Sequence, residues 1–516
     1  MQKRQREVLG WVETEGSEGW VREAGRPDRT DPIRRPTGVA RGNGRTGVRA
    51  SVVAQKARNG AGAKGTQEGG DVTDKPNQGQ PEAVPDTARR AGEIRSRWDW
   101  VEESVWTERM LEALEQGVKG GRWYSLMDKV VREANLRAGF RAVKARKGAP
   151  GVDHITVEQF EEHLDENVEK IGRQLRDGTY RPQANRRKWI NKPGSREKRP
   201  LGIPTVRDRV TQTALTHVLE PIFEREFAEH SYGFRPRRGC KDALRRVQQL
   251  LDQGYVWVVD ADIRSYYDTI PKPALLKRVE EKVVDSRVLK LLSDFLEQEI
   301  MDGLKHWTPD EGTPQGAVIS PLLSNIYLNP LDRTMAEAGY EMTRYADDFV
   351  ILCKTEEQAR EALAKVNQWM MENQLTLHPE KTRVVDACEA TGFDFLGYHF
   401  ERGYKWPRKK SLRKVKESLR NKTKRTNGQS LDVIIGDVNR TLRGWFEYFK
   451  HSHRTTFRPL DGWVRERLRS ILRKRNKRKG RATGKDHQRW PNAYFARQGL
   501  FSLEQAHAQA CQSSCR

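Results

Sequence analysis

The sequence has few cysteines and no long apolar segment. Its five cysteines are an odd number scattered over 516 residues, which argues against the disulfide framework of a small secreted protein. No stretch of about 18 apolar residues is present, and the basic N-terminus has no apolar segment of the kind found in secretory signals. These absences predict a cytoplasmic protein in a reducing compartment, with no membrane partner.

Aromatic residues are scarce at the N-terminal end. Residues 1–95 contain no Phe or Tyr and only Trp11 and Trp20, among many Gly, Pro, Arg and Asp. Such a segment cannot bury enough apolar surface to fold alone. We therefore predict a disordered extension over residues 1–95, and the alternative is a basic arm that becomes ordered on RNA.

Basic residues are in excess, and they are unevenly distributed. The chain has 95 Lys and Arg against 71 Asp and Glu, a formal net charge of +24, and a pI near 9.8. Residues 401–490 alone hold 29 Lys and Arg against 8 Asp and Glu, so their local net charge is 29 minus 8, or +21. Without a membrane segment, this charge favours a nucleic acid as the partner.

Two separated segments offer carboxylates for a metal site. The residues 341–345 and 349–353 have the composition of short strands, so Asp347 and Asp348 should lie near a hairpin tip. Adjacent side chains on a strand point to opposite faces, so a third carboxylate must come from elsewhere. Asp262, which closes an apolar strand-like run, is the best candidate. Carboxylates suit Mg²⁺, and a metal pair can activate a hydroxyl and neutralise a leaving phosphate.

Five sequence blocks resemble one protein family, in the order in which that family carries them. They are RPLGIPTVRDR at 199–209, SYGFRP at 231–236, DIRSYYD at 262–268, GTPQG at 312–316 and YADD at 345–348. In these blocks the chain resembles the group II intron-encoded reverse transcriptases with maturase activity, over roughly residues 120–480. A lone pair of aspartates would be a weak signal, whereas five blocks in order are specific.

The resemblance implies an α+β fold of the right-hand polymerase type, with fingers, an α/β palm and a helical thumb. The expected divisions follow the disordered extension and are a helical N-terminal fingers segment (96–180), the reverse transcriptase fingers and palm (181–400), a basic helical thumb or maturase X domain (401–482) and a short C-terminal tail (483–516). Within the fingers, apolar residues from Phe160 to Leu175 at helical spacing predict one amphipathic helix.

The resemblance also implies a function. The protein would be an RNA-directed DNA polymerase that binds its intron RNA to assist splicing and copies it into cDNA during retrohoming. Its partners would be the intron RNA, an RNA template with a DNA primer, a target DNA and deoxynucleoside triphosphates, and its cofactor two Mg²⁺ ions. Asp262, Asp347 and Asp348 would be both the catalytic residues and the metal ligands. The alternatives are a reverse transcriptase recruited to a host function such as phage defence, and a non-catalytic RNA-binding splicing cofactor.

Five further residues match substrate-binding positions of the family. The resemblance places Lys192 and Arg199, on a basic hairpin, at the triphosphate of the incoming nucleotide. It makes Tyr267 a steric gate against the ribose 2′-hydroxyl, places Gln315 against the nascent base pair or the template backbone, and places Lys381 near the leaving pyrophosphate.

These positions also have plainer interpretations. The basic hairpin could be a solvated edge, Tyr267 could pack under Ile263, and Lys381 could form a surface ion pair with Glu380 or Asp386. The block at 231–236 mixes aromatic residues with Arg and could either stack on bases and clamp phosphates or fill the core.

Two more aspartates lie beside the proposed ligands. Asp260 shares a strand face with Asp262 and is a possible supporting group. Asp268 is predicted to cap a helix that begins near residues 271–275.

The basic segment carries one long helical stripe. Apolar residues spaced three or four apart predict a helix, and they are Leu431, Ile435, Val438, Leu442, Trp445 and Phe449. Similar spacing before and after it predicts two partner helices, hence a small helical thumb. The cations expected on the outward faces, and therefore on RNA, are Arg408, Lys409, Lys410, Arg473, Lys474, Arg475, Lys477 and Arg478.

No cluster of Cys and His follows the thumb. Many members of the family end in an HNH-type endonuclease that has such a cluster. The sequence therefore gives no support to cleavage of a second DNA strand, and it leaves the oligomeric state open.

Overall fold

The computed structural model describes residues 93–191, 198–478, 480 and 483–514. The chain divides into two units, Met1–Val84 and Pro85–Arg516, and every described residue belongs to the second. The predicted disordered extension, residues 1–95, lies almost wholly outside the described residues.

The first part of this unit is helical, with α2 (Glu108–Gln116), α3 (Met127–Val130), α4 (Glu133–Arg146) and the long α7 (Val206–Glu224). The prediction of a single amphipathic helix around residues 160–175 is wrong, because the segment forms two helices, α5 (Val157–Glu162) and α6 (Leu164–Arg176). His163 separates the two helices with a backbone of φ −118° and ψ 36°, outside the α-helical region. The apolar residues still face the core from both helices.

A four-stranded sheet, which we call the fingers sheet, begins after α6 in the chain. It has the strand order β2-β1-β4-β5, and its strands are β1 (Asn185–Asn191), β2 (Lys198–Ile203), β4 (Ile300–Asp302) and β5 (Lys305–Trp307). β1 and β2 are antiparallel, with Ile190 opposite Arg199, as expected for the basic hairpin. The turn that joins them lies outside the described residues.

The palm sheet has the strand order β6-β7-β3-β8. Its strands are β3 (Trp257–Asp262), β6 (Glu341–Tyr345), β7 (Asp348–Cys353) and β8 (Arg383–Asp386). Alternate residues of β3 and β7 enter two different hydrophobic clusters, with Val259 and Ile351 in one and Val258 and Leu352 in the other. Both faces of the central strands are therefore buried, which explains their nearly continuous apolar sequence.

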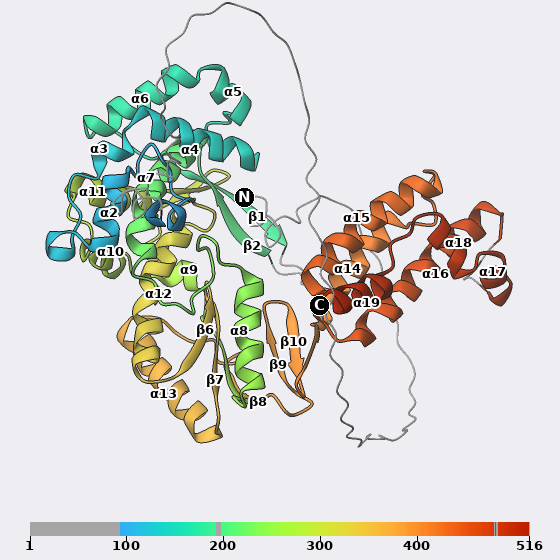
Figure 1. The fold of residues 1–516 in the computed structure, drawn as a ribbon. Coiled ribbons are helices and arrows are strands. Elements are labelled where there is room, and N and C mark those ends of the chain that lie inside the picture. The colour runs from blue at the N-terminus through green and yellow to red at the C-terminus, as the bar shows by residue number, and fades with distance from the viewer. Residues whose placement is uncertain (1–92, 192–197, 479, 481–482, 515–516) are drawn as a thin grey trace, which may run out of the picture. The chain divides into compact units, whose positions relative to one another are not determined.

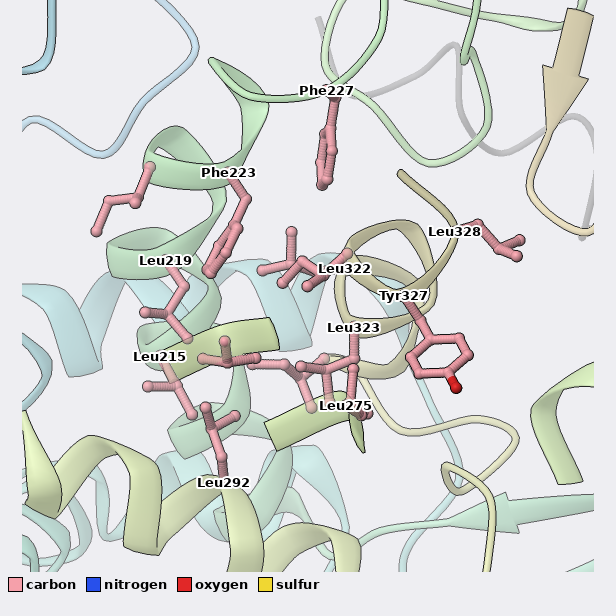
Figure 2. Close-up of a cluster of buried hydrophobic side chains, with 14 of the residues drawn as sticks. Leu215, Leu219, Phe223, Phe227, Leu275, Leu292, Leu322, Leu323, Tyr327 and Leu328 are labelled. Carbon is pink, nitrogen blue, oxygen red and sulfur yellow. The ribbon is translucent and has the colours of Figure 1, made fainter. Parts of the chain in front are cut away.

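Helices cover both faces of the palm sheet (Figure 1). They are α8 (Cys240–Asp252) on one side and α13 (Glu356–Glu372), with α12 (Ser320–Glu337), on the other. Figure 2 shows α7 and α12 meeting in the first cluster, where Leu219 and Phe223 lie near Leu322 and Leu323. The short helices α9 (Tyr266–Thr269), α10 (Lys272–Glu280) and α11 (Ser286–Leu296) complete this region.

A three-stranded sheet and three helices form the thumb region. The strands are β9 (Phe393–Phe395), β10 (Tyr398–Glu401) and β11 (Tyr404–Pro407), and the thumb helices are α14 (Lys409–Lys422), α15 (Leu431–Phe449) and α16 (Phe457–Arg475). The predicted stripe of α15 is buried from Ile435 to Phe449, which confirms its packing role. The chain continues with α17 (Gly484–Arg489), α18 (Asn492–Arg497) and α19 (Leu503–Ser514).

The α+β class predicted from the sequence is confirmed. In the described part of the chain, no helix is both long enough and apolar enough to span a bilayer.

Candidate active site

Asp262 and Asp348 lie side by side at one edge of the palm sheet. Asp262 is the last residue of β3 and Asp348 the first of β7, and the antiparallel register places them directly opposite one another. The Cβ atoms of such a pair are about 4.5–5.5 Å apart. Asp347 belongs to the two-residue turn between β6 and β7, since Tyr345 pairs with Asp348. The three predicted ligands therefore gather at one edge of the sheet.

A buried arginine holds this turn in place. Ala346 has a φ of 60°, a left-handed conformation that is uncommon for a residue with a Cβ atom. Arg344 is fully buried and donates hydrogen bonds to the Ala346 carbonyl at 2.9 Å and to Asn325 Oδ1 at 2.9 Å. Its Nε donates to Asp332 Oδ1 at 2.7 Å. A buried, fully bonded ion pair of this kind is costly to break, so the turn has a rigid support.

The block at 231–236 supports the same turn from the other side. Tyr232 N donates to the Arg344 carbonyl at 2.9 Å, and Asn325 donates to the Gly233 carbonyl at 2.8 Å. A Cβ atom at Gly233 would meet the Ala346 nitrogen at 2.2 Å, so only glycine allows this approach. Arg235 is 2% exposed and forms an ion pair with Glu224 at 2.8 Å. It therefore cannot clamp a phosphate, which was one of the two interpretations of this block.

The carboxylates repel one another. Burial, followed by the charges of Asp347, Asp260 and Asp262, raises the pKa of Asp348 to about 7. Burial and the charge of Asp262 also raise the pKa of Asp347. Burial raises the pKa of Asp260 to about 6, although Arg383 lies 3.2 Å from it and favours its charged form. Burial and the closeness of the carboxylates therefore disfavour the charged forms of Asp260, Asp347 and Asp348, and a bound cation would favour them.

Lys381 contacts the first of these acids. Its ammonium group forms an ion pair with Asp262. The plainer interpretation had expected Glu380 or Asp386 as the partner. Among the described residues, no group of three or more His, Cys, Asp or Glu side chains is arranged to hold a metal ion. The metal-ligand roles of Asp262, Asp347 and Asp348 remain predictions.

Tyr267 and Gln315 border the carboxylates. Tyr267 packs edge-on against Tyr266, with ring centroids 5.5 Å apart, and burial raises its pKa to about 12. Gln315 Nε2 donates to both carboxylate oxygens of Asp268 at 3.2 Å. The predicted capping role of Asp268 is wrong, because Pro271 precedes α10 and provides no side-chain cap.

The two predicted triphosphate contacts have different outcomes. Arg199 is exposed on β2, where a ligand could reach it. Lys192 lies outside the described residues. The loop that contains Gln315 is joined to the same strand, because Gly202 N donates to the Gln315 carbonyl at 2.7 Å.

The predicted RNA-binding cations do not all face outward. Arg408 precedes α14, its charge favours the ionised form of Asp348, and its Nε is buried with no hydrogen-bond partner. Arg408 is half-exposed and belongs to the surroundings of the carboxylates, and its role in RNA binding stays a prediction. Lys409 and Lys410 are exposed at the start of α14.

The second predicted basic run is partly engaged within the protein. Arg473 forms an ion pair with the buried Asp486, and Arg478 lies 4.0 Å from the same carboxylate. Arg475 donates to the Gln429 carbonyl. Lys474 and Lys477 are exposed, so they are the members of the run that point most clearly to solvent.

Sequence reasoning missed two arrangements. The first is the pairing of Arg344 with Asp332, for which the signal was a charged residue inside a strand that is otherwise buried. The second is a group of cations around Trp463, where Lys416, Arg420 and Arg467 lie 5.8–5.9 Å from the indole ring. Its signal was a four-residue spacing between Lys416 and Arg420, and between Trp463 and Arg467.

Two family models match the chain. Residues 190–400 match the reverse transcriptase (RNA-dependent DNA polymerase) family, and residues 412–490 match the maturase-specific domain of group II introns.

Two curated relatives illustrate the similarity. Protein YkfC of Escherichia coli (strain K12) is 33% identical over 308 residues, which cover 52% of this chain and 80% of that protein. The group II intron-encoded protein LtrA of Lactococcus lactis subsp. cremoris is 36% identical over 207 residues, 40% of this chain and 34% of that protein. The chain therefore aligns with most of one relative and about a third of the other.

Proposed function

Because the chain belongs to the family of group II intron-encoded reverse transcriptases and carries their maturase-specific domain, we propose that it copies its intron RNA into DNA. The synthesis takes place at Asp262, Asp347 and Asp348, and the thumb binds the same RNA to assist splicing. A DNA primer, deoxynucleoside triphosphates and a target DNA are the further partners of this reaction during retrohoming.

The carboxylate edge suits hard divalent cations. Its donors are oxygen atoms of short side chains, held by strand ends and a rigid turn, and burial followed by the charges of the neighbouring carboxylates raises the pKa values of Asp347 and Asp348, an arrangement that a bound cation would relieve. Two Mg²⁺ ions, when bound, would supply activation of the primer 3′-hydroxyl and neutralisation of the charge on the leaving phosphate. The three aspartates would hold them.

The surrounding residues orient the substrates. Lys381, already beside Asp262, can exchange this partner for the leaving pyrophosphate and donate a proton to it. Arg199 on the fingers sheet offers a planar, bidentate donor to the triphosphate. The ring of Tyr267, half-buried against the core, would crowd a ribose 2′-hydroxyl and so favour deoxynucleotides.

One observation carries this proposal, namely the register that pairs Asp262 with Asp348 beside Asp347. The test is primer extension on an RNA template with Asp347→Asn, compared with Asp432→Asn, which removes an exposed carboxylate from α15. We expect synthesis to be lost in the first variant and retained in the second. Undiminished synthesis by Asp347→Asn would remove the assignment.

The splicing role has a separate test. Purified protein, the RNA that flanks its gene and Mg²⁺ are combined, and spliced RNA and cDNA are measured in one reaction. Asp347→Asn should lose cDNA and keep splicing, since RNA binding by the thumb does not need the palm carboxylates. Loss of both products would contradict the assignment of splicing to the thumb.

A further inference from the structure

Two tryptophans and an arginine form a stack on the fingers sheet. The Arg187 guanidinium lies 5.3 Å from the ring centroid of Trp189 and 4.5 Å from that of Trp307. Arg187 and Trp189 are alternate residues of β1 and so share one face of the sheet. Trp189 is 46% exposed. We call this arrangement the Trp189–Arg187–Trp307 ladder.

The ladder is held rigidly by two hairpins. Trp189 Nε1 donates to Asp302 Oδ2 at 3.0 Å, which ties β1 to the last residue of β4. β1 also pairs with β4, and β4 pairs with β5, so that Ile300 lies opposite Trp307. The polar group of the Trp189 indole is therefore satisfied inside the protein, and the exposed part of its ring is an apolar surface with a fixed position.

The charge around the ladder suits a polyanion. On the ladder's face the four strands carry Arg187, Lys198 and Lys305, since Lys198 lies opposite Asn191 and Lys305 opposite Asp302 in the strand register. Their one acid is Asp302, which accepts the hydrogen bond from Trp189. Exposed aromatic rings among cations are typical of surfaces on which the bases of a single strand stack while the cations contact its phosphates.

The ladder is continuous with the candidate active site. Gly202 of the fingers sheet donates to the Gln315 carbonyl at 2.7 Å, and the Gln315 side chain donates to Asp268 at 3.2 Å. The charge of Arg187 favours the ionised form of Asp268, so the guanidinium faces this junction. Asp268 directly follows Tyr267, so the ladder begins beside the residues that border the carboxylates.

We propose that the Trp189–Arg187–Trp307 ladder binds the unpaired template RNA ahead of the point of synthesis, by stacking on its bases. The inference rests on the proposed function, because the strand in question is the one being copied. A duplex cannot use such a surface, since its bases are already stacked on one another, whereas every unpaired base offers a ring face. The contact is therefore tolerant of sequence, as copying requires.

The test compares templates with different lengths of unpaired RNA. Primer extension is measured for Trp189→Leu and for Trp189→Leu with Trp307→Leu, on one template with a long 5′ extension and one with a single unpaired base. For Trp189→Leu we expect the KM for the long template to rise about tenfold, the size of effect that the loss of one stacked base produces. The KM for the short template and both kcat values should stay within about twofold, since the change lies in template binding alone.

The control is Tyr124→Leu, which removes an aromatic ring that is 61% exposed and lies outside the fingers sheet. It should change neither KM. Trp189→Phe should keep most of the affinity, because it keeps a ring. Thermal unfolding of each variant identifies any loss of fold. An equal rise of KM on both templates, or no rise on either, overturns the proposal.

A second measurement separates this inference from the polymerase assignment. Binding of a single-stranded RNA to Asp347→Asn is followed by quenching of tryptophan fluorescence, with and without Trp189→Leu. We expect Asp347→Asn to bind the strand normally and the added Trp189→Leu to weaken binding about tenfold. If Asp347→Asn still makes DNA, the proposed catalytic role fails while this binding result stands. If Trp189→Leu leaves binding unchanged, the ladder fails alone.

Discussion

The palm and the thumb each gather charges of one sign, but they hold them in different ways. In the palm, short aspartate side chains are fixed by strand ends and by a turn, and the buried Arg344 and the close approach of Gly233 support that turn. Aspartate has only two side-chain torsions, so the strand ends and the turn largely set where the carboxylates lie. Their position is therefore a property of the backbone.

In the thumb, long side chains extend from helices. Lys416 and Arg420 of α14 and Arg467 of α16 surround Trp463. Burial, and the charges of Arg420 and Arg425, lower the pKa of Arg467. Among the described residues, none forms an ion pair with Lys416, Arg420 or Arg467. These three cations around Trp463, which we call the Trp463 cluster, lack a counter-charge that phosphate would supply.

The difference teaches what each charge can do. Carboxylates fixed by the backbone can place reacting atoms to within fractions of an ångström, so one altered residue should abolish the activity. Cations on flexible stems contact a charged backbone one by one, so their loss should weaken binding in steps. The four predictions below test this contrast, in order of expected effect.

The largest effect should come from Asp262→Asn compared with Asp260→Asn. The two residues lie on the same face of β3, but Asp262 is opposite Asp348 while Asp260 is bonded to Arg383. We expect primer extension by Asp262→Asn to fall below about one-thousandth of the original rate, as for a group that acts in a unit with others. Asp260→Asn should keep most of the rate. Similar losses in both variants would mean that negative charge, rather than position, matters in the palm.

The same substitution, glycine to alanine, should act in opposite directions in the two regions. Gly233→Ala places a Cβ atom 2.2 Å from the Ala346 nitrogen, so the turn must move, and we expect primer extension to fall at least about a hundredfold. Gly444→Ala, in the middle of α15, meets no atom within 4 Å and should stabilise the thumb by up to about 1 kcal/mol. Steady-state kinetics and chemical unfolding measure the two effects. Normal synthesis by Gly233→Ala would show that the turn does not need this support.

A smaller effect is expected from removing two thumb cations. The double variant Lys416→Gln with Arg420→Gln removes two members of the Trp463 cluster, and Lys474→Gln with Lys477→Gln removes two exposed cations from the predicted run. Both lose the same net charge. We expect the first to weaken RNA binding about tenfold and to reduce its salt slope by about 1.5 to 2. The control, Lys474→Gln with Lys477→Gln, should lose less than half as much RNA affinity. A larger loss of affinity in the control would place the RNA-binding site at the predicted run instead.

Much of the fold and of the candidate site was predictable, because local rules determine it. The blocks at 262–268 and 345–348 predicted strands with carboxylates at their ends. In the structure, β3 ends at Asp262 and β7 begins at Asp348. The stripe of α15 follows helical spacing, and its burial is confirmed. The family matches confirm the resemblance, and with it the class of RNA-directed DNA polymerase.

What the sequence did not predict depends on contacts between distant segments. The support of the turn joins Gly233, Asn325 and Asp332 to Arg344, and no local pattern indicates which of many polar residues meet. The burial of the Arg408 Nε atom and the engagement of Arg473 by Asp486 were missed for the same reason. In a run of cations, spacing alone does not tell which ones find a partner after folding.

The smallest effect should come from a charge that serves neither site. Glu220 lies on α7, and burial, followed by the charge of Glu224, raises its pKa to about 7, although Arg146 opposes the shift. Since the folded protein holds this proton more tightly than the unfolded chain, stability is lost as pH rises from about 4.5, the ordinary glutamate value, through about 7.

Glu220→Gln cannot lose a proton, so it should be more stable than the original protein at pH 8 and about equally stable at pH 5. We expect a gain on the order of 1–2 kcal/mol at the higher pH, measured by chemical unfolding at both values. The exposed Glu112→Gln should show no such dependence. An equal effect of Glu220→Gln at both pH values would indicate lost packing or hydrogen bonding, because only a titrating charge makes the difference grow with pH. Glu220 belongs to neither the palm carboxylates nor the Trp463 cluster, so the change in stability at this position gives the size of a purely structural charge effect. The effects of the palm and thumb variants can be compared with it.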